Sequence, residues 1–114
     1  STETLLWAKK NKKAKHTFHY DAMKVQNGGK QMKCVWQIAP PNKIEKNFGK
    51  HPTQKPLALV ERCIQAASNV GDLIFDPFMG SGTTGVAALR NGRKFCGCEM
   101  DGEFFELAKK RLGE

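Results

Sequence analysis

The chain lacks any apolar run long enough to cross a membrane, and no signal peptide is recognisable at its start. Cysteine is also scarce, with only four in 114 residues. Neither these cysteines nor the three histidines show the paired spacing of zinc ligands, so no metal site is predicted. Cys96 and Cys98 share one face of a predicted strand and are expected in the core. These features predict a cytoplasmic protein with reduced thiols.

Acidic residues are few in the first half of the chain. Residues 1–56 hold twelve lysines and three acids, a net charge of +9, whereas residues 57–114 hold seven basic and eight acidic residues, a net charge of −1. Dense lysines attract a phosphate backbone through counterion release, so contact with double-stranded DNA is one interpretation. A solvated basic face is the other. The densest group, and the candidate DNA contact, comprises Lys9, Lys10, Lys12, Lys13 and Lys15.

The most informative motif is the segment DPFMGSGTTG at residues 76–85, which follows a short apolar run and precedes the apolar residues VAAL. This order predicts a buried strand, a glycine-rich turn and a helix. Glycines at 80, 82 and 85 allow the backbone to approach a ligand closely, and the first amides of the helix point into the same space. A nucleotide-like ligand is one prediction, and a tight turn without a ligand is the alternative. A Walker phosphate loop is disfavoured, because no Lys-Ser or Lys-Thr follows the glycines.

Two carboxylates flank this turn. Glu99 closes the predicted strand 94–98, 19 positions after Gly80, where a carboxylate can accept both hydroxyl hydrogens of a ribose. Asp76 favours a cationic group such as an amino-acid ammonium, although an Asp-Pro pair also commonly starts a turn. The ring of Phe78 suits a flat base or a sulfonium-bearing chain. Together these residues favour S-adenosylmethionine over a nicotinamide dinucleotide.

A second motif, HPTQKP at residues 51–56, precedes a predicted helix at 56–69 with apolar residues at helical spacing. Pro56 suits the first turn of this helix, where its missing N–H costs nothing. Polar residues 53–55 are thereby delivered to a helix N-terminus, which suits a carboxylate. An ordinary capped helix is the alternative.

The two motifs, in this order and about 20 residues apart, with Glu99 beyond them, closely resemble the DNA methyltransferases that methylate adenine N6 or cytosine N4, often in restriction–modification systems. The resemblance covers residues 51–112 strongly and residues 2–9 and 35–40 loosely. It implies S-adenosylmethionine as the cofactor. The implied cofactor-binding residues are Asp76, Phe78, Gly80 and Gly82 beside the methionine part, Ser81, Thr83 and Thr84 with hydroxyls and amides close by, Glu99 on the ribose, and His51, Thr53 and Lys55 near the cofactor carboxylate.

One part of the family pattern is missing. Such enzymes carry an Asp/Asn/Ser-Pro-Pro-Tyr/Phe tetrapeptide, which grips the exocyclic amine of a flipped-out base. Residues 76–79 lack the second proline, and Pro40-Pro41 has the wrong residue on each side. We therefore assign no catalytic residue and expect that tetrapeptide in an N-terminal catalytic part preceding Ser1, in cis or in trans. The chain alone is expected to transfer no methyl groups; a non-catalytic DNA-binding or regulatory remnant is the alternative.

The predicted fold is α/β, part of a Rossmann-like methyltransferase sheet of parallel strands with flanking helices. Residues 1–50 are predicted as an irregular basic segment with one core strand and part of a DNA-facing region, and residues 51–114 as the cofactor-binding region. About three strands leave a sheet edge unpaired, which predicts association, including a homodimer. The expected strands are 2–9, 73–76 and 94–98, with a weak strand signal at 32–36. The expected helices are 56–69, 83–91 and 102–112, and residues 20–26 form a helix or a hairpin arm. Asp101 is the expected N-cap of the last helix, whose residues Phe105, Ala108 and Leu112 are expected to face the sheet.

Overall fold

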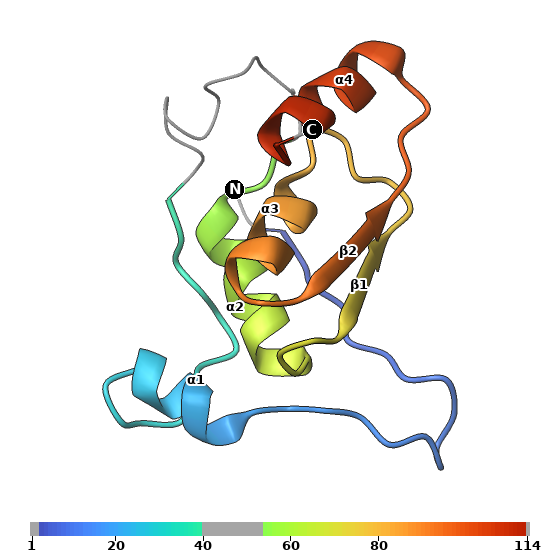
Figure 1. Cartoon of the computed structure of the whole chain (residues 1–114). Coiled ribbons are helices and arrows are strands. Elements are labelled where there is room, and N and C mark those ends of the chain that lie inside the picture. Colours follow the sequence, from blue (N-terminus) through green and yellow to red (C-terminus); the bar gives the residue numbers. More distant parts are fainter. Residues whose placement is uncertain (1–2, 40–53, 114) are drawn as a thin grey trace.

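The computed structural model describes residues 3–39 and 54–113. In these residues the elements follow the order α1 (Tyr20–Gln26), α2 (Leu57–Ala67), β1 (Leu73–Asp76), α3 (Thr83–Arg90), β2 (Lys94–Gly97) and α4 (Gly102–Arg111). Helix α1 stands at one end of the molecule, away from the strands and α4 (Figure 1). None of the helices described is long and apolar enough to span a membrane.

Strands β1 and β2 form a parallel sheet, in which Leu73 lies opposite Lys94 and Asp76 lies opposite Gly97. Parallel neighbours need a crossover connection, and α3 provides it. The predicted parallel α/β arrangement is therefore confirmed. Both strands end at the same edge of the sheet, and the glycine-rich turn starts there.

The core lies between one face of the sheet, α3 and α2. Ile64 of α2 is buried against Ala87 and Ala88 of α3, whose small side chains allow the two helices to approach closely. Ile74 and Phe95 of the two strands pack against the same cluster. Helix α3 therefore holds α2 on one side and the sheet on the other.

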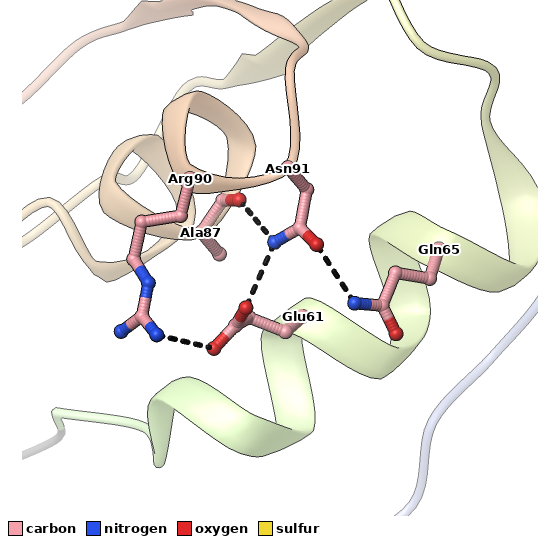
Figure 2. A network of polar contacts seen from close by, with 5 residues as sticks. All are labelled: Glu61, Gln65, Ala87, Arg90 and Asn91. Carbon is pink, nitrogen blue, oxygen red and sulfur yellow. Dashed lines mark hydrogen bonds and ion pairs between the residues drawn. The ribbon is translucent and has the colours of Figure 1, made fainter. Parts of the chain in front are cut away.

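Polar contacts also join α2 to the end of α3 (Figure 2). The Asn91 side-chain amide donates to Glu61 Oε2 at 2.9 Å and to the Ala87 carbonyl at 2.7 Å, while Gln65 donates to Asn91 Oδ1 at 2.7 Å. Arg90 forms a longer ion pair with Glu61, at 3.9 Å. Asn91 thus lies at the centre of this polar network, at the end of α3.

The buried guanidinium of Arg93 closes the end of α2. It donates to the Ser68 hydroxyl at 3.0 Å and to the Ser68 carbonyl at 2.7 Å. It also reaches the carbonyls of Ile64 and Asn91. The Ile64 carbonyl also accepts from the amide and the hydroxyl of Ser68, so the cation adds a charged donor at a helix end whose carbonyls carry partial negative charge.

No element of residues 3–39 and 54–113 covers the opposite face of the sheet. Among the described elements only α3 contacts the strands, and the side chains on the other face are exposed, with 59% of Phe75 accessible to solvent. Cys96 and Cys98 are exposed as well, so the prediction that they lie in the core was wrong. The prediction that the two side chains lie on the same face was correct. Burial of that face would need a second layer of structure, and no described element supplies one.

The predicted strand at residues 2–9 was wrong. Residues 3–9 form no strand, and Leu6 is 92% exposed. A strand is stabilised by a hydrogen-bonded neighbour, which this segment lacks among the described residues. Instead, the ring of Trp7 packs edge-on against His16 at 4.8 Å and lies 5.1 Å from the ring of Phe18.

The weak strand signal at residues 32–36 was also wrong. Residues 31–39 contain no strand, and the Trp36 indole N–H donates to the Lys33 carbonyl at 2.9 Å in a local turn. The guanidinium of Arg62 lies over the Trp36 ring, 5.0 Å from its centroid. The described part of the chain therefore holds two strands rather than about three.

Residues 20–26 form the helix α1 rather than a hairpin arm. Its anchor is Met23, which is only 1% exposed. The His19 amide donates to the Ala66 carbonyl at 2.8 Å, and its ring Nε2 lies 3.0 Å from the Ser68 carbonyl. Helix α1 is thus attached to the C-terminal part of α2 and to the residues that follow it.

Helix α4 begins at the predicted cap, because Asp101 accepts hydrogen bonds from the amides of Glu103 and Phe104. Its buried residues are Leu107 and Ala108. The prediction that Phe105 faces the sheet was wrong, since its side chain is exposed. Helix α4 contacts α3 and not the strands. The buried face of α4 therefore packs against α3 and against the turn that precedes α3.

Candidate functional site

The glycine-rich turn, residues 77–82, crosses the carboxyl ends of both strands. The Met79 amide donates to the Cys98 carbonyl at 2.9 Å, which ties the turn to the end of β2. Gly80 and Gly82 have φ angles of +54° and +85°, a region that side chains rarely adopt. A Cβ on Gly82 would also lie 3.1 Å from the Cβ of Ala108 in α4. Glycine is therefore required at position 82 by its conformation and by close packing.

The first turn of α3 has no side-chain cap. Its N-cap residue is Gly82, which offers no acceptor, whereas Asp101 caps α4. Unpaired amides at a helix start carry partial positive charge and favour an anionic group. The start of α3 is therefore suited to a carboxylate or another anion.

Asp76 holds the start of the turn. Its Oδ1 accepts from the Phe78 amide at 3.0 Å, and its Oδ2 accepts from the Thr84 hydroxyl at 2.7 Å. The alternative interpretation, in which Asp76 starts a turn, is therefore consistent with its hydrogen bond to the Phe78 amide. A carboxylate offers about four acceptor positions, so two bonds leave capacity for a ligand cation. Its ligand role stays a prediction.

Glu99 joins the turn to the start of α4. Its Oε1 accepts from the Gly80 amide at 3.0 Å, and its Oε2 accepts from the Asp101 amide at 2.8 Å. Glu99 therefore lies directly beside the glycine-rich turn. The side chain is half-buried and keeps unused acceptor positions, which is compatible with the predicted ribose contact.

The hydroxyls of the turn are engaged within the protein. Ser81, 3% exposed, donates to Gln54 Oε1 at 3.2 Å, and Arg111 donates to the hydroxyl of Thr83 at 2.8 Å. Thr84 donates to Asp76. The predicted contribution of these three residues to a ligand is therefore best met by their backbone amides, which remains a prediction.

The phenyl ring of Phe78 is 86% exposed beside the turn, and Met100, after β2, is also exposed. Burying a large apolar side chain contributes about 1.5–3 kcal/mol of free energy. The exposed ring would therefore gain stability by packing on a ligand or on a further part of the protein. Its stacking role stays a prediction.

The second motif is only partly placed. His51 and Thr53, predicted near the cofactor carboxylate, lie outside the described residues. Lys55 is exposed and forms an ion pair with Glu3 at 2.9 Å. An exposed ion pair contributes at most about 1 kcal/mol, so this contact would not prevent Lys55 from reaching an anion.

Two residues of this region were not among the predicted site residues. Gln54 is buried and accepts the Ser81 hydroxyl, and Arg111 donates to the Ser81 carbonyl at 3.0 Å. As a basic residue in the last turn of α4, Arg111 also suits the helix dipole. Its spacing of three residues from Ala108 places it on the buried side of that helix, a signal that the sequence contained.

The five lysines proposed for DNA contact, Lys9, Lys10, Lys12, Lys13 and Lys15, are all exposed. A separate open cavity of about 430 Å³ lies beside the end of α1 and is lined by residues that include Lys33, Trp36 and Arg62. Both features combine positive charge with access from solvent, and neither adjoins the glycine-rich turn in sequence.

Parallel strands, a glycine-rich turn at their carboxyl ends and an acid closing the second strand define the class of nucleotide-binding α/β proteins. Comparison with known proteins narrows this class. The sequence profile of the family described as DNA methylase matches residues 1–110. The chain therefore belongs to the DNA methylase family, which confirms the prediction from its two motifs.

Curated relatives include the Type II methyltransferase M2.DpnII of Streptococcus pneumoniae, 58% identical over 98% of this chain. M2.MboI of Moraxella bovis is 48% identical over the whole chain. This chain spans only about 42% of the length of each. Among solved structures, an M1.HpyAVI–SAM complex has a TM-score of 0.74 and 41% identity, covering 90% of this chain and 47% of the other. PvuII DNA methyltransferase, which is cytosine-N4-specific, has a TM-score of 0.71 and 26% identity, covering 86% of this chain and 36% of the other.

Proposed function

We propose that this chain is the cofactor-binding part of a DNA methyltransferase that transfers a methyl group from S-adenosylmethionine to adenine N6 or cytosine N4. The observation that carries the proposal is the turn at residues 77–82, held between Asp76 and Glu99 at the carboxyl ends of two parallel strands. The family match and the likeness to a protein solved in complex with SAM support the same cofactor.

The residues present fit this cofactor. The uncapped start of α3 offers amides to a carboxylate, and Asp76 offers acceptor positions to an ammonium. Glu99 keeps acceptor positions for the ribose hydroxyls. When bound, the cofactor supplies an electrophilic methyl group on a sulfonium sulfur. The protein's part here is to bind and orient that group, and no residue of the chain is assigned to hold the target base.

We further propose that methyl transfer needs a catalytic part beyond these 114 residues, joined in cis or in trans. Two observations support this: the sequence holds no Pro-Pro-aromatic tetrapeptide, and the face of the sheet carrying Leu73 and Phe75 is exposed. Parallel sheets are normally covered on both faces. A second copy of this chain is the alternative cover for the exposed face of the sheet. Analytical ultracentrifugation of the chain alone tests it. A homodimer predicts a mass that rises with protein concentration, whereas a monomer at high concentration excludes the homodimer.

The cofactor proposal is tested by calorimetric titration with S-adenosylmethionine. We expect saturable binding that weakens about tenfold or more in Glu99→Gln, because an acceptor bond to the ribose loses its charge. Glutamine retains one oxygen for the Gly80 amide, but its amide nitrogen cannot accept from the Asp101 amide. An unchanged thermal unfolding midpoint is therefore required to show that the turn survives. Glu106→Gln is the matched control, an exposed acid on α4 changed in the same way. Tighter binding of a nicotinamide dinucleotide, or no binding of S-adenosylmethionine, would contradict the proposal.

A second candidate function is DNA binding without catalysis, which the exposed lysines at positions 9–15 favour. Fluorescence anisotropy with duplex DNA at several salt concentrations tests it. Replacing the five lysines by glutamine should weaken binding and flatten the salt dependence, because each lost phosphate contact lowers the slope by about one. DNA binding in a chain with no affinity for S-adenosylmethionine would favour this function over the first.

A further inference from the structure

Helix α4 is attached to the glycine-rich turn along its length. Near its start, Glu99 bridges the amides of Gly80 and Asp101. Further along, Ala108 packs directly against Gly82, where even a Cβ would be crowded. The turn is therefore shaped by the helix that follows β2, as well as by the strands it leaves.

At the far end of α4, one nitrogen makes three contacts with the turn and the first residue of α3. Arg111 Nη1 lies 3.0 Å from the Ser81 carbonyl, 2.8 Å from the Ser81 hydroxyl and 2.8 Å from the Thr83 hydroxyl. Ser81 and Thr83 are both buried. Hydrogen bonds from a charged donor to buried acceptors are stronger than neutral ones, so this contact restrains the backbone on both sides of Gly82.

The same serine connects the turn to the second motif. The Ser81 hydroxyl donates to Gln54 Oε1 at 3.2 Å while it accepts from Arg111. Gln54 is itself buried and lies just before Lys55 and the start of α2. The Ser81 hydroxyl therefore joins three parts of the chain: α4, the turn and the segment before α2.

We propose that Arg111 is a positioning residue for cofactor binding: it holds residues 81–83 so that the uncapped amides at the start of α3 keep the direction in which they meet the ligand. This inference rests on the proposed binding of S-adenosylmethionine at the turn. A segment with two glycines is costly to order, and a site ordered before binding gains affinity. Arg111 is assigned no contact with a reacting atom, and the proposed effect is carried by its contacts with Ser81 and Thr83.

The test compares Arg111→Gln with three other variants of the same chain. Arg111→Lys is the conservative rescue, because the contacts with Ser81 and Thr83 come from one nitrogen and an ammonium carries three donors. Lys110→Gln is the charge-matched control, an exposed neighbour on α4. Arg93→Gln is the structural control, since it removes another buried guanidinium that binds the end of α2 instead of the turn.

Two measurements separate the inference from the function on which it rests. The first is affinity for S-adenosylmethionine: we expect Arg111→Gln to weaken it about tenfold, Arg111→Lys to restore part of it, and the two controls to change it little. The second needs no cofactor: amide hydrogen exchange at Gly80 and Gly82 should accelerate in Arg111→Gln and not in Lys110→Gln.

Unchanged exchange at these amides in Arg111→Gln would overturn the inference whatever the ligand. If the unsubstituted chain binds S-adenosylmethionine and Arg111→Gln binds it equally well, the inference fails and the proposed function stands. If the unsubstituted chain does not bind it at all, the proposed function fails, and the role in cofactor binding fails with it. If Arg93→Gln weakens binding as much as Arg111→Gln does, Arg111 contributes only general stability, which also overturns the proposal.

Discussion

Residues 54–113 and residues 3–39 belong to one chain but are organised in different ways. The first region buries Ile64, Ala87 and Ala88 between helices and a sheet, and its buried polar side chains have partners. The second buries Met23 and leaves leucine and tryptophan side chains exposed. The region with the cofactor motifs is therefore closed by its own contacts, whereas the basic region is attached mainly through α1.

The largest expected effect is a core truncation in the first region. Ile64→Ala should lower the free energy of unfolding by about 3 kcal/mol, because it leaves a cavity between α2 and α3. Leu6→Ala, at an exposed position of the second region, should change it by less than about 0.5 kcal/mol. Urea denaturation measures both. Equal costs would show that residues 3–9 are packed in solution.

Loss of the buried Arg93 guanidinium is expected to lower the free energy of unfolding somewhat less than Ile64→Ala does. Arg93→Gln should lower the free energy of unfolding by about 2 kcal/mol, since carbonyls of Ile64 and Ser68 lose charged donors. The matched change Arg90→Gln removes only a long ion pair whose arginine is mostly exposed, and it should cost less than about 1 kcal/mol. The comparison fails if the two variants unfold at the same denaturant concentration.

Met23→Ala separates local from global effects. The anchor of α1 is lost, so we expect faster hydrogen exchange of the amides in residues 20–26 with little change in those of α2 and α3. Hydrogen exchange followed by mass spectrometry gives the answer. A loss of protection throughout residues 54–113 would instead show that the two regions unfold as one unit.

The smallest expected effect concerns the cysteines. Burial raises the pKa of the Cys63 thiol, whereas Cys34, Cys96 and Cys98 are exposed. Because the thiolate is the reactive form, a raised pKa leaves less of it at a given pH, and Cys63 should be alkylated last, with its rate rising only at higher pH. Mass spectrometry after brief treatment with iodoacetamide provides the test. Early labelling of Cys63 would mean that α2 detaches readily.

The same contrast explains what the sequence could predict. The cap at Asp101 and the strand at 73–76 follow from local spacing, and the structure contains them. Burial of Cys96 required a second layer on the sheet, and a strand at residues 2–9 required a neighbouring strand. Such requirements depend on other parts of a fold, which local pattern does not reveal.

Arg111 illustrates the opposite failure. A basic residue at the end of α4 is explained locally by the helix dipole, and its charge alone gives no sign of the contact with Ser81. A basic residue three positions from a buried alanine lies on the inner side of its helix. That spacing, rather than charge, was the signal for its contact with the turn.

The central claim is that the ligand site belongs to the first region, at the turn between Asp76 and Glu99. NMR titration of the isotope-labelled chain with S-adenosylmethionine tests it most directly. The account predicts saturable shifts of the amides in residues 78–84 and 99–101, with those of residues 20–36 unchanged. Shifts confined to the amides around α1, or none at any cofactor concentration, would contradict it.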